Sequence, residues 1–355
     1  MIADYLYMLR RFNRNVRLYL LSGALIGFTA AGGIYGVLLN LYLLRLGYGL
    51  ELVGPVAAAG ALSYAVFCLP AGALGRRWGS RRMMVLGMIL IVLGNGVLPL
   101  AEFLPSPWQW KWLLATRALR ALGFAFYMVN ASPFLMSATG SEERTHVFSV
   151  QAALWPLSGF AGSLVGGFLP GLFASFLGVS LDGPEAYRYT LFVATVLLSP
   201  AVLVLLATRE VGVEHRQEKV SQAGPVPLGP IVFMALVMLL QTAGMGAVQT
   251  YFNVYLDQGL EVSTALIGSL VAAGQLVGGI AALATPLVAV RWGYIRIVVW
   301  GSLGTALSLL PLVLVPHWGA AGLSFVGISA LTTIRFAAIA VYQQEMVSTR
   351  WRTFM

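Results

Sequence analysis

The sequence predicts an all-α protein that crosses a membrane many times, and two observations carry this prediction. Hydrophobic residues make up 59% of the 355 residues and charged residues only 10%, whereas soluble globular chains average about 25% charged residues. The apolar residues also form continuous blocks of about 20, which is long enough for a helix to span the hydrocarbon core of a bilayer. The blocks lack the alternation of apolar and polar residues that marks a membrane β-barrel.

Ten apolar helices are expected, six before and four after one polar segment. Their expected bounds are 18–44, 51–75, 83–103, 113–137, 147–175, 188–208, 230–256, 263–289, 295–315 and 322–348. The polar segment, 209–229, is charged and then rich in Gly and Pro, which is typical of a solvated connector. The expected organisation is therefore a six-helix bundle at 1–208, a cytoplasmic linker at 209–229, and a bundle at 230–355 with four helices present.

The basic residues predict the orientation of these helices. If the N-terminus is cytoplasmic, 16 of the 22 Lys and Arg residues fall in inner segments and three in outer segments. This is the bias that the positive-inside rule describes. The net charge of +9 then reflects topology, and nucleic-acid binding, which would need a basic face with interleaved aromatic residues, is not expected. We expect an integral protein of a bacterial inner (plasma) membrane.

The two halves of the sequence resemble each other at an offset of 213–215 residues. "RWGSRR" at 77–82 matches "RWGYIR" at 291–296, and "AAGAL" at 58–62 matches "AAGQL" at 272–276. Further matches in the same order are Gly54 with Gly268, "NLYL" at 40–43 with "NVYL" at 253–256, Arg120 with Arg335, and Tyr127 with Tyr342. A duplicated helical bundle is a common plan of secondary transporters, whose binding site lies between the two copies.

The segment "GALGRRWGSRR", 72–82, resembles the loop between helices 2 and 3 of the major facilitator superfamily (MFS), which reads Gly-x-Leu-x-Asp-Arg-x-Gly-Arg-Arg/Lys-Arg/Lys. The residues that fit are Gly72, Leu74, Arg77, Gly79, Arg81 and Arg82, whereas Arg76 replaces the Asp and Ser80 replaces an Arg. The resemblance implies a two-bundle fold that alternates access by rocking one bundle against the other. It also implies twelve helices, so we expect the chain to be a C-terminally truncated piece of a longer protein; the alternative is a protein that has lost its last two helices.

The loop at 72–82 and its repeat are candidates for a cytoplasmic gate. Their basic side chains could meet carboxylates or helix C-termini when the inner side is closed; the alternative is that they only record topology. The candidate gating residues are Gly72, Arg76, Arg77, Gly79, Arg81, Arg82, Arg291, Gly293 and Arg296.

Three arginines lie within predicted helices: Arg117, Arg120 and Arg335. A charge inside a span costs about 2.5–3.5 kcal/mol on insertion scales, so each should face a cavity or a partner. The resemblance implies that helices 4 and 10 line the central cavity, where Arg120 and Arg335 would close on an anion from opposite halves. Structural roles, or snorkelling of Arg117 to the surface, are the alternatives. Other residues on helices expected to face the cavity are Tyr127, Gln151, Trp155, Gln275 and Tyr342.

The polar residues favour transport over catalysis. No acidic residue lies clearly within a predicted helix, and His146, His215 and His317 are isolated in predicted loops, so neither a nucleophile–base set nor a metal or cofactor site is indicated. The predicted function is secondary active transport of a small molecule by a monomer, with efflux of amphipathic compounds favoured. The alternatives are uptake or exchange of an organic anion through Arg120 and Arg335, and a non-transporting receptor or scaffold.

Overall fold

The computed structural model describes residues 12–30, 32–210 and 228–346, and every regular element in these ranges is a helix. Nine helical segments of the described chain are long and apolar enough to cross a membrane. The expected all-α polytopic architecture is therefore confirmed. The predicted linker lies mostly outside the described residues.

Helical segments occupy all ten predicted ranges, several of them as two consecutive pieces. The first half contains α2 (Arg14–Thr29), α3 (Ile34–Arg45), α4 (Leu50–Trp78), α5 (Ser80–Val97), η1 (Leu98–Phe103), α6 (Ser106–Ala138), α7 (Ser141–Leu177), α8 (Glu185–Leu198) and α9 (Pro200–Leu206). The second half contains α10 (Leu228–Val254), η2 (Tyr255–Gly259), α11 (Thr264–Trp292), α12 (Tyr294–Ser308), α13 (Leu310–Leu314) and α14 (Trp318–Met346).

Two of the differences from the predicted bounds have local reasons. Helix α6 begins seven residues before the expected position 113, because Pro107 is tolerated in a first turn and polar residues can extend a helix beyond its apolar block. The expected first helix, 18–44, is divided into α2 and α3 by a break around Gly32 and Gly33. Gly32 has φ +83°, a left-handed conformation that favours glycine, and a Cβ on Gly33 would collide with the carbonyl oxygen of Phe28.

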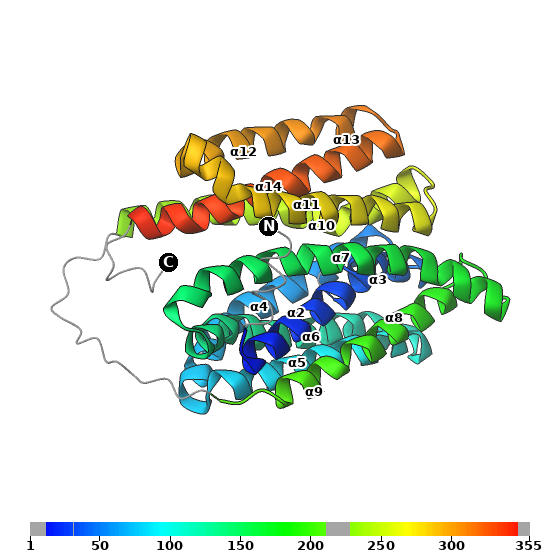
Figure 1. Ribbon diagram of the computed structural model, residues 1–355. Helices are drawn as coiled ribbons and strands as arrows, with labels where there is room; N and C mark the ends of the chain where they lie inside the picture. Colours follow the sequence, from blue (N-terminus) through cyan, green and yellow to red (C-terminus); the bar gives the residue numbers. More distant parts are fainter. Residues whose placement is uncertain (1–11, 31, 211–227, 347–355) are drawn as a thin grey trace.

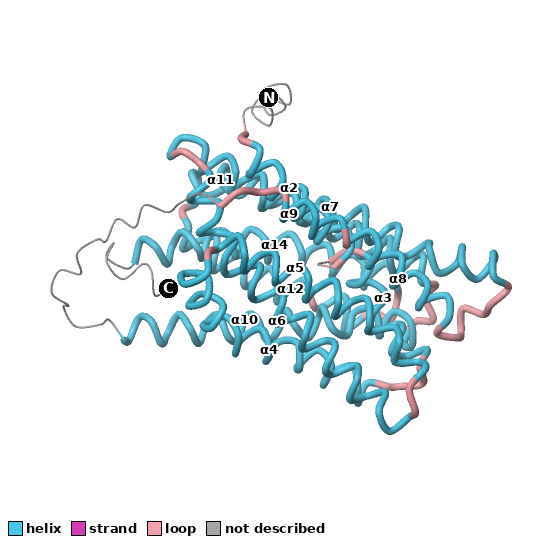
Figure 2. Tube along the Cα trace, turned by 90° about the horizontal axis from the view of Figure 1, so that it is seen from below, coloured by secondary structure: helices cyan, strands magenta, loops and turns pink. Residues whose placement is uncertain are grey.

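The helices of the second half gather on one side of those of the first half (Figure 1). Helix α7 packs along α11, and α10 contacts α3 and α4. The long helices run along one common direction, with most connecting loops at the two ends of the molecule (Figure 2). We call the end formed by residues 76–82, 206–210 and 291–296 the basic end, and the end formed by residues 45–50, 178–185 and 257–263 the Arg45 end.

The apolar core shows that the two halves meet near the Arg45 end. One hydrophobic cluster continues across both halves and includes Tyr42, Leu52 and Tyr187 from the first half and Leu256 and Ile267 from the second. A second cluster, around Tyr19, Met88 and Phe134, lies within the first half alone. The packing that joins the halves is therefore concentrated away from the basic end.

Within the first half, α5 and α6 cross with their backbones in contact at Gly87 and Gly123. A Cβ on Gly87 would lie 2.5 Å from the carbonyl oxygen of Gly123, and a Cβ on Gly123 would lie 2.5 Å from that of Gly87. Small residues at such crossings allow the van der Waals packing that drives helix association in lipid.

We expect Gly123→Val to lower the free energy of unfolding by about 1–3 kcal/mol or more, because the added atoms force two backbones apart. The measurement is thermal unfolding of the purified protein in detergent. Gly171→Val on α7 is the control, because a Cβ there has no neighbour within 4 Å. Equal melting temperatures for the two variants would contradict this packing.

Candidate substrate cavity

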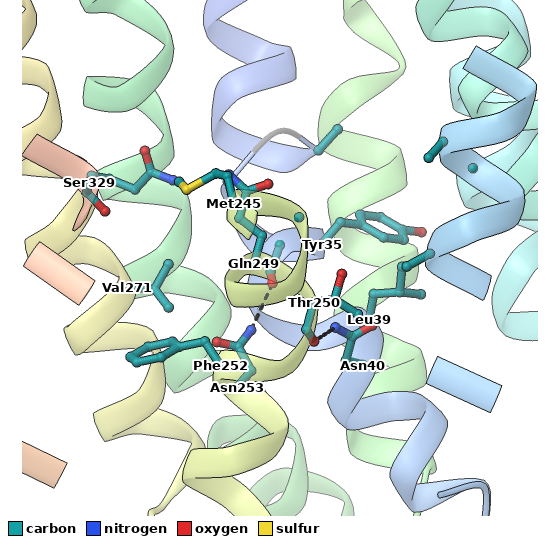
Figure 3. A pocket seen from close by; sticks show the side chains of 18 of the residues that line it. Tyr35, Leu39, Asn40, Met245, Gln249, Thr250, Phe252, Asn253, Val271 and Ser329 are labelled. Atoms are coloured by element: carbon teal, nitrogen blue, oxygen red, sulfur yellow. Dashed lines mark hydrogen bonds between the residues drawn. The ribbon is translucent and has the colours of Figure 1, made fainter. Parts of the chain in front are cut away.

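A cavity of about 700 Å³ lies between the two halves. Residues of α3, α4, α6 and α7 line it from the first half, and residues of α10, α11 and α14 line it from the second. Figure 3 shows Tyr35, Leu39 and Asn40 on one side and Met245, Gln249 and Ser329 on the other. The cavity thus lies at the interface of the two repeats, where the sequence placed a binding site.

The lining combines aromatic and amide side chains. Its aromatic residues are Tyr35, Tyr64, Phe124, Phe252, Phe325 and Phe336, and its amides are Asn40, Gln249, Asn253 and Gln275. Apolar walls with a few placed polar groups are typical of small-molecule sites. Such a lining suits a compound that has both an apolar body and polar groups.

Arg117 and Arg120 bring positive charge into this lining. Arg120 donates a hydrogen bond from Nη2 to the carbonyl oxygen of Ala30, 3.0 Å away, at the break between α2 and α3. The Nε atoms of both arginines are buried without a hydrogen-bond partner. Arg117 lies against Gly60 of α4, where a Cβ would be 2.9 Å from its Nε, so Gly60 makes room for the guanidinium group.

The break between α2 and α3 is a part of the site that the sequence analysis missed. Two carbonyl oxygens at this break accept hydrogen bonds from side chains. The carbonyl of Ala30 accepts one from Arg120, and the carbonyl of Gly32 accepts one from Ser163 at 2.7 Å. Discontinuous helices line the sites of many transporters. The sequence feature that indicates this break is the pair Gly32–Gly33 in the middle of an apolar block.

The remaining cavity candidates on α6 and α7 pack against α2. Tyr127 is fully buried, and its hydroxyl lies 3.1 Å from that of Ser22. Gln151 donates to the hydroxyl of Tyr19 at 2.6 Å. Trp155 packs near Gly23 and Gly27 and lies behind the cavity residue Phe124, with 5.8 Å between the ring centroids. Of the predicted residues, Gln275, Arg117 and Arg120 lie in the lining.

Arg335 takes a different position from Arg120, although the repeat matches the two. Its side chain is buried between α14 and α12, where a Cβ on Gly301 would lie 3.4 Å from the Cβ of Arg335. Its neighbour Phe336 is the residue that lines the cavity. The structure therefore does not bring Arg120 and Arg335 together across the cavity. The side chain of Tyr342 is not among those that the structure describes.

The predicted gating loop makes its described contacts within the first half. Arg81 donates to the carbonyl oxygen of Leu206 at 2.6 Å and to the hydroxyl of Thr208 at 3.2 Å. Gly72 faces α6, 3.5 Å from Val129 if given a Cβ. The arginines Arg76, Arg77, Arg82, Arg291 and Arg296 are exposed.

The two glycines of this motif have a structural role in both copies. Gly79 has φ +95° and Gly293 has φ +75°, conformations that other residues rarely adopt. Each caps a helix, because Gly79 donates its N–H to the carbonyl oxygen of Gly75 and Gly293 donates to that of Ala289, both at 2.9 Å. The repeated "RWG" thus ends α4 and α11 with the same turn.

Two asparagines matched by the repeat bind reciprocally across the halves. Asn40 on α3 donates to the carbonyl oxygen of Thr250 at 2.6 Å, and Asn253 on α10 donates to those of Gly36 and Val37 at 2.9 and 3.0 Å (Figure 3). Each asparagine therefore binds the backbone of the other's helix. These bonds join the halves on the side of the cavity toward the Arg45 end.

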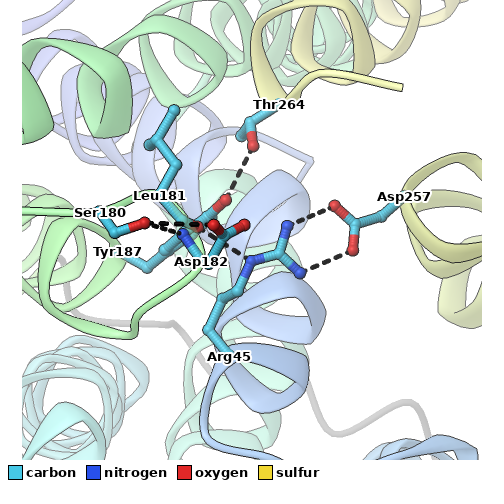
Figure 4. A network of polar contacts seen from close by, with 7 residues as sticks. All are labelled: Arg45, Ser180, Leu181, Asp182, Tyr187, Asp257 and Thr264. Carbon is cyan, nitrogen blue, oxygen red and sulfur yellow. Dashed lines mark hydrogen bonds and ion pairs between the residues drawn. The ribbon is translucent and has the colours of Figure 1, made fainter. Parts of the chain in front are cut away.

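An ion pair joins the halves at the Arg45 end itself, and the sequence analysis missed it. The guanidinium group of Arg45 donates to both carboxylate oxygens of Asp257, at 2.8 and 2.6 Å, and to the carbonyl oxygen of Leu181 at 3.0 Å (Figure 4). Nearby, the hydroxyls of Tyr187 and Thr264 lie 2.9 Å apart. The sequence feature that indicates this ion pair is that the matched segments 40–43 and 253–256 are followed closely by residues of opposite charge, Arg45 and Asp257.

Comparison with known proteins identifies the fold and the family. The sequence model described as Major Facilitator Superfamily matches residues 7–355. An uncharacterised MFS-type transporter of Mycobacterium tuberculosis (strain H37Rv) is 24% identical over 345 residues, covering 94% of this chain and 73% of the relative. The resemblance carried by residues 72–82 is thereby confirmed.

Solved structures share the fold at low sequence identity. An inward-facing, occupied structure of a bacterial homologue of the human lysosomal transporter Spinster superposes with a TM-score of 0.73 at 16% identity, covering 96% of this chain and 76% of that chain. A nucleoside transporter superposes with a TM-score of 0.68 at 13% identity, covering 96% and 83%. At such identities the likeness concerns the fold alone.

Proposed function

The chain belongs to the major facilitator superfamily, and from this premise we propose that it exports amphipathic small molecules by alternating access. Membership makes it an integral membrane protein of a secondary-transporter family. The observation that carries the proposal is a cavity lined by both halves, with hydrogen bonds and an ion pair closing it at one end. A polypeptide with this cavity can pass a bound molecule across by closing one end before the other opens.

The closed end is the Arg45 end. Hydrogen bonds and an ion pair join the two halves on that side of the cavity, from Asn40–Thr250 to Arg45–Asp257. The positive-inside rule places the basic end in the cytoplasm. In this proposal the conformation with a closed Arg45 end corresponds to the cytoplasm-facing state, in which an exporter takes up its substrate.

The character of the lining supports an amphipathic substrate. Aromatic rings supply apolar contact area, and amides such as Gln249 and Gln275 can donate and accept hydrogen bonds. In this proposal the protein works as a monomer in a bacterial inner membrane with its N-terminus in the cytoplasm. Light scattering of the purified protein tests the oligomeric state.

We expect the purified protein in proteoliposomes to move at least one of three probes saturably under an imposed ion gradient: cationic ethidium, neutral N-phenyl-1-naphthylamine or anionic 1-naphthoate. Protein-free liposomes are the control, and opposite gradients test the direction. If the folded protein moves no probe faster than the control, the alternative of a non-transporting receptor or scaffold replaces this proposal.

A further inference from the structure

The cavity carries positive charge that the described lining does not neutralise. Arg117 and Arg120 both line it, and no Asp or Glu is among the described residues of the lining. The two arginines are three positions apart on α6, so their side chains lie on the same face of the helix and repel each other. An ionised group in a membrane interior needs a partner or water, and among the described residues only the carbonyl of Ala30 accepts a hydrogen bond from Arg120.

Local packing holds both guanidinium groups at the cavity. Arg117 is pressed against Gly60 and its Nε is buried, so it does not extend along α6 to the Arg45 end as a snorkelling side chain would. Arg120 is anchored by its hydrogen bond to the α2–α3 break. Both guanidinium groups can therefore donate hydrogen bonds from their Nη atoms to an acceptor in the cavity.

The first turn of α3 adds to the positive potential at this point. Helix α3 begins at Ile34, directly after the break that Arg120 contacts, and Tyr35 and Gly36 of its first turn line the cavity. The amino-terminal end of a helix carries a partial positive charge and free N–H groups, which favour anions. The two charged side chains and the amino-terminal end of α3 therefore both favour an anion at this point of the cavity.

Aromatic rings lie beside the two arginines. Phe124 is one helical turn beyond Arg120 on α6, Tyr64 is one turn beyond Gly60 on α4, and the centroids of these two rings are 5.8 Å apart. Both rings line the cavity. A ligand whose anionic group meets the arginines can thus place an apolar ring against Tyr64 and Phe124.

We propose that Arg117 and Arg120 together bind the anionic group, a carboxylate or a phosphate monoester, of an amphipathic aromatic substrate. The site is formed by neighbouring residues of one helix, which differs from the pair Arg120 and Arg335 that the repeat suggested. The proposal rests on the proposed function, whose substrate it narrows to organic anions. Planar guanidinium groups suit the oxygens of both kinds of anion.

The test compares four probes that share one ring system: 1-naphthoate, 1-naphthyl phosphate, the neutral 1-naphthamide and the cationic 1-naphthylmethylamine. Binding to the purified full chain in detergent is measured by the ligand-induced rise in melting temperature. At least one anion should bind at least tenfold more tightly than the amide, and comparison of the two anions identifies the preferred group. Equal binding of the anions and the amide would overturn the proposal.

Variants then locate the site. Arg117→Gln and Arg120→Gln should each remove the preference for the anion over the amide, whereas Arg17→Gln, which removes an exposed charge on α2, should retain it. Gly60→Ala provides a second route, because its Cβ displaces Arg117 without changing any charge, and it should weaken anion binding alone. Retention of the full preference in Arg120→Gln or in Gly60→Ala counts against the site.

The flux assay separates this proposal from the transport proposal. If ethidium or the neutral probe is transported while the anions neither bind nor move, transport stands and the anion site fails. If an anion binds through Arg117 and Arg120 but no probe moves, the site stands and transport fails.

Discussion

Replacing Gly167 with leucine is expected to open the Arg45 end and to reduce transport at least fivefold. Gly167 on α7 and Gly268 on α11 bring the backbones of the two halves into contact: a Cβ on Gly268 would lie 2.5 Å from the Cα of Gly167 and 2.7 Å from the carbonyl oxygen of Ser163. Overpacking such a contact costs about 1–3 kcal/mol. In a two-state equilibrium this energy changes the populations by roughly 5- to 150-fold.

The measurement is the rate at which a membrane-impermeant maleimide, added from the Arg45 side, labels a cysteine at Thr250 in a Cys68→Ser background. Thr250 lines the cavity, and Cys68 is the only native cysteine. Labelling should become faster in Gly167→Leu. Gly171→Leu is a matched control on the same helix, because a Cβ there meets nothing within 4 Å. Similar labelling rates in both variants would show that the glycine contact does not hold this end closed.

Removing one partner of the Arg45–Asp257 ion pair is expected to shift the same equilibrium. The two side chains are 20% and 8% exposed, so the charge that is left behind loses its partner in a largely water-free position. Breaking such a pair costs about 2–5 kcal/mol. Because the pair exists only when the halves meet, this cost falls on the closed Arg45 end, and Arg45→Gln or Asp257→Asn should speed labelling at Thr250 and slow transport.

A double-mutant cycle tests whether the two residues act as a pair. Arg45→Gln with Asp257→Asn should cost less than the sum of the single variants, since no charge is left unpaired. Arg188→Gln is the control, because Arg188 pairs with Glu102 at 2.7 Å within the first half and should not change accessibility at Thr250. Strictly additive single effects would mean that the ion pair does not close this end.

The repeat predicted some contacts well because matched residues in the two copies make the same kind of backbone turn, close approach or hydrogen bond. Gly79 and Gly293 end α4 and α11 with the same left-handed turn. Gly54 and Gly268 each lie where a helix approaches the other half, the first against Tyr251 and the second against Gly167. Asn40 and Asn253 cross-bind to each other's helices.

The repeat was misleading for Arg120 and Arg335 because a sequence match does not fix the rotation of a helix against its neighbours. Arg120 faces the cavity and reaches the α2–α3 break. In the second half, the aliphatic part of Arg335 packs against Gly301 of α12, and the neighbouring Phe336 lines the cavity instead. The gating role of the basic loops stays a prediction, since the ion pair between Arg45 and Asp257 that joins the halves lies at the other end.

The sequence by itself determined the all-helical membrane-spanning architecture and the family. Lipid is the reason: each span must satisfy its own backbone hydrogen bonds with about 20 apolar residues, so the fold is encoded locally. Only the tertiary structure decided that Arg117 joins Arg120 at the cavity, that Arg335 does not, and that Arg45 meets Asp257. Arg45 and Asp257 are far apart in the chain, and which arginines face the cavity depends on how helices rotate and cross at positions such as Gly60 and Gly301.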